Sequence, residues 1–62
     1  MEKTYTESEV FGGGYGMFDV EIMAVGMKVA MADGFYGDSE GYEIEVKGGV
    51  VISGGGYGWV LK

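Results

Sequence analysis

The chain has 62 residues, which is too few for more than one domain, so we expect residues 1–62 to form a single small unit. A chain of this length buries only about 60% of its unfolded surface. It has neither Cys nor His, so disulfides and the usual zinc ligands cannot reinforce its thin core. Four basic residues against ten carboxylates give a net charge of −6, which argues against binding to nucleic acid or to anionic membranes.

The composition is unusual in what it omits. Asn, Gln, Arg, His, Pro and Cys are all missing, while Gly fills 14 positions; average usage predicts about three prolines and a Gly share of about 7%. Apolar residues make up 47% of the chain, which is too rich for disorder. The first ten residues lack the pattern of a secretion signal, and residues 22–32 are too short for a membrane helix. We expect a folded, soluble protein without a targeting segment, and its location stays unassigned.

The first repeated feature along the chain is the segment GGGYG, found at residues 12–16 and again at 54–58. Glycine tolerates torsions that a β-carbon forbids, and designed barrels place glycine kinks beside a covering aromatic ring. We interpret both copies as corners of bent strands with an aromatic lid; a flexible loop with an incidental Tyr is the alternative. Neither copy fits the phosphate-binding pattern GxGxxG, because Met17 and Trp59 stand at the last glycine position.

Alternating apolar and polar residues predict strands from residue 18 onward, and no glycine-free helical stripe occurs. The apolar phase changes between residues 18–22 and 23–31. A β-bulge near Ile22–Met23 would restore the faces, and a change of sheet is the alternative. Asp33-Gly34 predicts a two-residue hairpin turn, which would pair Met31 with Tyr36 and Met23 with Ile44.

Residues 42–47 alternate most clearly and predict a half-buried strand. Gly48-Gly49 then predicts a second hairpin that places Val46 opposite Val51. The core phase continues along alternate residues to Trp59 and Leu61. The other face carries Val50, Ile52 and Val60, for which two readings stay open: coverage by the N-terminal strand, or exposure to solvent.

Together these patterns predict an all-β fold: a small closed or partly open antiparallel barrel. We expect about five strongly bent, Gly-kinked strands with mainly meander connectivity and no α-helix.

No catalytic, cofactor-binding or metal-binding residue is assigned, and we do not expect an enzyme. The serines have no His to activate them. Glu43 and Glu45 share one strand face, as acid–base chemistry would require, but a solvated strand face carries such charges routinely. The acidic segment 33–43, with Asp33 and Asp38, misses the EF-hand spacing, so only weak incidental Ca²⁺ binding is left open. The Tyr residues lack the basic groove that single-stranded nucleic-acid binders use.

The Gly/aromatic corners at 12–16 and 54–58, the hairpin signals and the restricted alphabet give the whole chain a resemblance to de novo designed small β-barrels of SH3-like or OB-like size. The resemblance implies a structural scaffold with no evolved ligand and no specific partner, expected as a monomer. One alternative is a binding module that uses a Tyr-lined barrel mouth or the acidic 33–43 segment for a cation or small apolar ligand. A second is self-association through strand edges.

Overall fold

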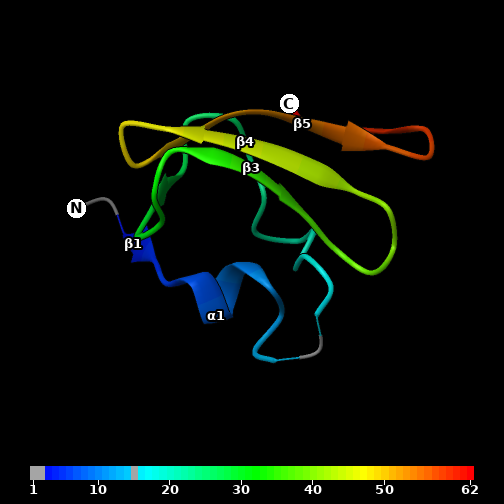
Figure 1. The fold of residues 1–62 in the computed structure, drawn as a ribbon, viewed down its shortest axis with the longest axis horizontal. Helices are drawn as coiled ribbons and strands as arrows, with labels where there is room; N and C mark the ends of the chain where they lie inside the picture. The colour runs from blue at the N-terminus through cyan, green and yellow to red at the C-terminus, as the bar shows by residue number, and fades with distance from the viewer. Residues whose placement is uncertain (1–2, 15) are drawn as a thin grey trace.

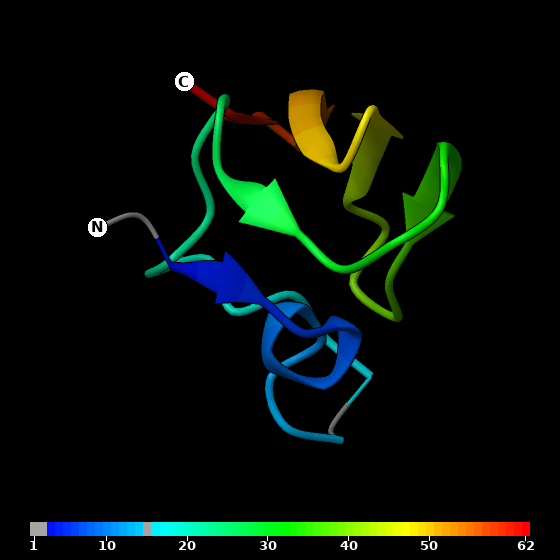
Figure 2. The ribbon, with the colours of Figure 1, turned by 90° about the vertical axis from the view of Figure 1, so that its left-hand side faces the viewer.

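The computed structural model describes residues 3–14 and 16–62, which form a curled sheet and one turn of helix. The elements, in chain order, are β1 (Thr4–Tyr5), α1 (Glu7–Val10), β2 (Lys28–Val29), β3 (Gly34–Gly37), β4 (Glu43–Lys47), β5 (Val50–Gly56) and β6 (Trp59–Val60). The strands follow the order β1-β2-β5-β4-β3, with β6 paired to β5 off this path. Only β1 and β2 pair in parallel among these strands. The sheet bends around the interior as an open half-barrel (Figure 2), which confirms the predicted all-β fold in its partly open form.

The β4–β5 hairpin is the most regular part of the sheet. Gly48 and Gly49 turn the chain with φ of 62° and 74°, as a type I′ turn requires, and Val46 lies opposite Val51. This prediction is confirmed. The register shifts between Glu45 and Val46, which leaves Ile52 as an extra residue of β5.

The predicted hairpin at Asp33-Gly34 is wrong. β3 pairs with β4 instead, with Tyr36 opposite Ile44, so the chain reverses at residues 38–42. The Asp33 carboxylate accepts the Gly48 N–H at 2.8 Å and therefore supports the β4–β5 turn rather than its own. The reversal at residues 38–42 depends on Asp38, whose side chain accepts backbone N–H groups further along the turn. Such local hydrogen bonds from a side chain to the backbone compete with the formation of a two-residue hairpin.

Residues 17–27 form turns, so the predicted strand and its β-bulge at Ile22–Met23 are wrong. The backbone N–H of Ile22 donates to the carbonyl of Asp19, and that of Met27 donates to the carbonyl of Ala24. Phe18 and Met23 are nevertheless buried, whereas Val20 is 46% exposed. Burial in this stretch therefore follows neither the alternation of the sequence nor a pleated strand.

The chain also contains one helical turn that the sequence reading missed. Thr6 and Glu9 form a capping box around α1: Thr6 Oγ1 accepts the Glu9 N–H at 3.2 Å, and Glu9 Oε1 accepts the Thr6 N–H at 3.0 Å. A four-residue helix has no room for an apolar stripe, so only this Thr-x-x-Glu signal marked it. The turn places Val10 in the core and brings Phe11 to within 5.0 Å of the Phe18 ring, centroid to centroid.

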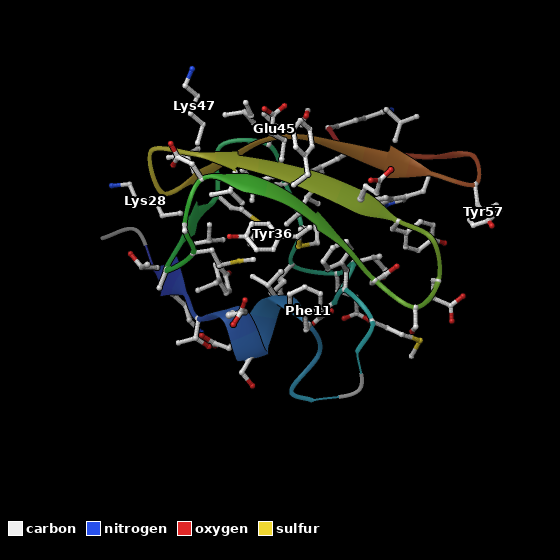
Figure 3. The ribbon with its side chains drawn as sticks, in the orientation of Figure 1. Phe11, Lys28, Tyr36, Glu45, Lys47 and Tyr57 are labelled. Carbon is white, nitrogen blue, oxygen red and sulfur yellow. The ribbon has the colours of Figure 1, made fainter. Side chains whose placement is uncertain are left out.

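The core lies between the concave side of the sheet and α1 (Figure 1). Its buried side chains are Val10, Phe18, Met23, Val29, Ile44, Val46, Val51 and Leu61. Figure 3 shows Tyr36 pointing into this interior toward Phe11, while Glu45 and Lys47 point away from it.

The last strands carry the apolar residues whose coverage the sequence left open. Val60 is 68% exposed and Ile52 is 42% exposed, so both face solvent, whereas Val50 is half-buried and lies opposite Lys28 of β2. Trp59 is also half-buried, and its ring contacts Tyr42 at a centroid distance of 4.8 Å. The predicted core phase is therefore wrong at Ser53 and Tyr57, which are exposed, and confirmed at Leu61, which is buried.

Candidate functional site

The outward side of strands β3, β4 and β5, hereafter the outer face, is the candidate site. Antiparallel pairing places Phe35, Glu45 and Ser53 in one row across the three strands. Residues directly opposite each other share a face. Glu45 points outward because its neighbours in β4, Ile44 and Val46, are 1% exposed and face the core, and Phe35 and Ser53 share its face through the pairing.

The next row of the outer face is almost bare. Glu43 lies opposite Gly37 of β3 and Gly55 of β5, and Gly55 is in turn opposite Val60. Because glycine has no side chain, Glu43 has no side-chain neighbour in this row on either side, where Gly37 is exposed and Gly55 is half-buried. The result is a shallow hollow of about 430 Å³, lined by Phe35, Glu43, Ile44, Glu45, Ser53, Gly54, Gly55 and Gly56.

The charge of this hollow is entirely negative among the described residues that line it. Glu43 and Glu45 supply two carboxylates, and Phe35, 73% exposed, supplies an aromatic ring beside them. Lys47 follows on the same side of β4, beyond Glu45 (Figure 3). The face thus runs from an acidic end to a basic end along one strand.

The acidic segment 33–43 does not gather into a cation site. Asp38 Oδ2 accepts the N–H of Phe18 at 2.8 Å, and its Oδ1 accepts the N–H groups of Glu40 and Tyr42 at 3.0 and 2.9 Å. Asp33 is committed to Gly48, as described above. Within residues 3–14 and 16–62, no three acidic, His or Cys side chains lie close enough together to hold a metal ion.

The tyrosines likewise do not line a common mouth. Tyr36 is half-buried and donates its hydroxyl to the carbonyl of Ala32 at 2.6 Å. Tyr42 packs on Trp59, and Tyr57 is 85% exposed at the β5–β6 turn (Figure 3). Tyr15, in the first GGGYG copy, lies outside the described residues.

An ion pair away from the outer face shifts two pKa values. Lys3 Nζ lies 2.7 Å from Glu9 Oε2, and this hydrogen bond, together with that from the Thr6 N–H, lowers the pKa of Glu9 to about 2. The same contact raises the pKa of Lys3. Both groups hold the N-terminal segment to the first turn of α1.

Sequence reasoning recognised that Glu43 and Glu45 share a face but missed the rest of the outer face. Phe35 joins them only through the β3–β4 register, and that register was hidden by the misplaced turn at Asp33-Gly34. The glycine run at 54–56 predicted a bend from the sequence alone. Its second effect, a position without a side chain beside the carboxylates, depends on the pairing of Glu43 with Gly55.

Searches against protein-family models, curated proteins and solved structures found no match. In the described part of the chain, no helix has the length and apolar character needed to span a membrane.

Proposed function

We propose that this chain is a designed structural scaffold, a small curled sheet with no evolved ligand and no catalytic activity. The observation that carries this proposal is the hydrogen bonding of Asp38, which lies in the acidic segment 33–43. Its carboxylate accepts three backbone N–H groups from two separate stretches of chain. A side chain committed in this way closes a loop and has little capacity left for a metal or a substrate.

The glycines support the same reading, since we infer that they supply the bends of the sheet. Gly56 ends β5 with φ of 142°, and a β-carbon there would lie 2.6 Å from the carbonyl oxygen of Gly41. A β-carbon on Gly41 would in turn overlap the Tyr57 ring, which lies over it. We infer that this ring serves as the kind of aromatic cover over glycine that designed barrels use.

The restricted alphabet is the third support. Six residue types are missing from a chain whose turns are made by glycine and Asp and whose core is made by Val, Ile, Leu, Met and Phe. Such a sequence fits selection for folding, because in the β4–β5 hairpin the turn glycines, the alternation and the core residues agree with one another. It offers no His, Cys or Arg for the commonest catalytic roles.

Chemical-shift mapping of the amide spectrum tests the proposal. Titration with Ca²⁺ and, separately, with an apolar dye is expected to give no saturable shifts in residues 33–43 or around the core. Saturable shifts centred on Asp38 and Glu40 would replace the scaffold proposal with a cation-binding function. Shifts centred on Tyr36 and the core would replace it with binding of an apolar ligand.

A further inference from the structure

We propose that the outer face binds an extended segment of a partner protein that carries arginine at every second position. The face offers an open hollow of about 430 Å³ beside two carboxylates and an exposed ring. Gly37 and Gly55, on either side of Glu43, carry no side chain, so a partner chain can approach the backbone there. This inference does not rest on the scaffold proposal, because charge complementarity gives affinity whether or not the face was selected for it.

The spacing of the carboxylates selects the pattern of the partner. Glu43 and Glu45 are two residues apart in β4, and two residues of a strand span about 6.6 Å. An extended partner lying along β4 presents its own alternate side chains at the same interval. Arg-x-Arg therefore places one guanidinium over each carboxylate, where each can form a bidentate, charge-assisted hydrogen bond.

Phe35 favours arginine over lysine at one of these positions. Its ring is 73% exposed and lies directly opposite Glu45. A guanidinium paired with that carboxylate can stack on the adjacent ring, a contact that arginine makes more readily than lysine does. The ring otherwise faces solvent at the edge of the sheet.

Lys47 sets the direction of the partner segment. It lies two residues beyond Glu45 on the same side of β4 (Figure 3), so the face reads acidic, acidic, basic. A partner reading Arg-x-Arg-x-Glu, laid parallel to β4, matches all three charges. The reversed order would place Glu over Glu43 and Arg over Lys47, and such like-charge contacts are destabilising.

A second copy of this chain is the rival occupant. β3 ends the strand order of the sheet, so its outer edge is available for pairing, and Phe35 sits on it. However, each copy carries a net charge of −6 and contains no arginine. Two outer faces stacked in parallel would place Glu43 and Glu45 against the same carboxylates, and an antiparallel stack would still place Glu45 against Glu45, so both arrangements are disfavoured.

The test uses the synthetic peptide acetyl-Gly-Arg-Thr-Arg-Thr-Glu-Gly-amide and the full chain labelled with ¹⁵N. Titration to about 5 mM peptide is expected to give saturable shifts confined to β3, β4 and β5, in the affinity range of a small, open interface. Replacing both arginines of the peptide by citrulline, which is nearly isosteric but neutral, is expected to weaken binding at least about tenfold, because hydrogen bonds between charged groups are lost. The peptide Arg-Thr-Glu-Thr-Arg has the same composition but matches the three charges in neither direction along β4, and it is expected to bind more weakly.

Variants of the chain locate the site. Removing both carboxylates with Glu43→Gln and Glu45→Gln is expected to lower affinity about tenfold. The control, Glu7→Gln with Glu21→Gln, reaches the same net charge through exposed residues elsewhere and is expected to change affinity less than about twofold. Ser53→Arg, which places a guanidinium opposite Glu45 within the chain itself, is expected to block the peptide while the amide spectrum shows that the fold is kept.

Three results would overturn the proposal. No saturable shift at the highest peptide concentration would remove the site. Equal binding of the citrulline peptide, or equal loss in the charge-matched control, would show that charge complementarity at the outer face is not the cause. Sedimentation that shows dimers which Ser53→Arg dissociates, together with no binding of the peptide, would assign the outer face to a second copy of the chain.

Discussion

The two halves of this molecule build their share of the core in different ways. In residues 34–60 the core side chains come from alternate positions of paired strands, as with Ile44 and Val46 of β4. In residues 3–33 the strands are only two residues long, and buried side chains such as Phe18 and Met23 come from turns. Individual hydrogen bonds therefore position the core residues of the first half, whereas the ladder of hydrogen bonds between paired strands positions those of the second half.

The difference follows from residue type more than from pattern. Residues 23–32 alternate as clearly as residues 42–47, but their intervening positions are mostly Ala and Gly. These residues have low β-propensity and add little cross-strand contact, whereas Val and Ile fill a pleated surface. Only Lys28–Val29 of that stretch forms a strand, while Gly26 adopts a φ of 95° in a turn.

The largest effect is expected from opening a cavity in the ladder half. Ile44→Ala removes a fully buried side chain between two neighbouring strands and should cost about 2–5 kcal/mol. The whole domain has only about 3–9 kcal/mol at typical stability per residue, so this variant should lose a large fraction of its free energy of unfolding. Urea titration followed by circular dichroism measures it.

Met23→Ala is the matched change in the half made of turns. Met23 is 8% exposed and flexible, and turns can close around a cavity more easily than a ladder, so its cost should lie at the lower end of the same range. Equal losses for the two variants would show that the turns are as rigid as the sheet.

The next effect concerns the carboxylate that joins the halves. Asp38→Ala removes the acceptor of the N–H groups of Phe18, Glu40 and Tyr42 and should cost about 1.5–3 kcal/mol. Asp19→Ala is the control, because its carboxylate accepts the Glu21 N–H at 3.2 Å within the first half alone. The free energy of unfolding of both variants decides the matter: a loss no greater for Asp38→Ala would mean that water replaces its contacts.

A smaller effect is expected from glycine, and again the halves should differ. Gly56→Ala combines a positive φ with a β-carbon 2.6 Å from the carbonyl oxygen of Gly41, so we expect a loss of about 1–3 kcal/mol. Gly26→Ala has a positive φ but no atom within 4 Å, so only the torsion opposes it and the loss should be smaller. Thermal melting of the two variants gives the comparison, and a larger loss at Gly26 would contradict it.

These contrasts also show which parts of the fold the sequence could predict. Gly48-Gly49 was readable because the turn residues and the flanking Val46 and Val51 agree on one register. The Asp33-Gly34 signal is equally strong locally, but the turn at residues 38–42 wins because Asp38 ties it to Phe18, twenty residues away. A hydrogen bond between residues so far apart in the chain produces no periodic pattern in the sequence.

The candidate site, like the fold, could be predicted from the sequence only in part. The shared face of Glu43 and Glu45 follows from their spacing in one strand, and the structure places both on the outer face. Their neighbours come from other strands, so the hollow appears only once the partners of β4 are known. A site made across a sheet depends on register, and one misplaced turn conceals it.

The smallest effect on stability is expected when the pH is lowered and Glu9, in the first turn of α1, is protonated. The pKa of Glu9 is lowered to about 2 by Lys3 and by the Thr6 N–H, below the value of 4.5 for a free glutamate. The contribution of this carboxylate is therefore fully present above about pH 4.5 and is lost as the pH falls toward 2. Glu9→Gln keeps the side-chain oxygen for the cap but removes the charge.

Thermal melts at pH 5 and pH 2.5 should consequently show a smaller loss of melting temperature in Glu9→Gln than in the parent chain. Lys3→Met separates the two causes, because it removes the ion pair and leaves the capping box intact. If Lys3→Met also reduces the acid sensitivity, the pair holds the N-terminal segment; if it does not, the cap alone does. An unchanged acid response in Glu9→Gln would show that this exposed contact adds nothing, and that the first half depends on Val10 and the turns behind it.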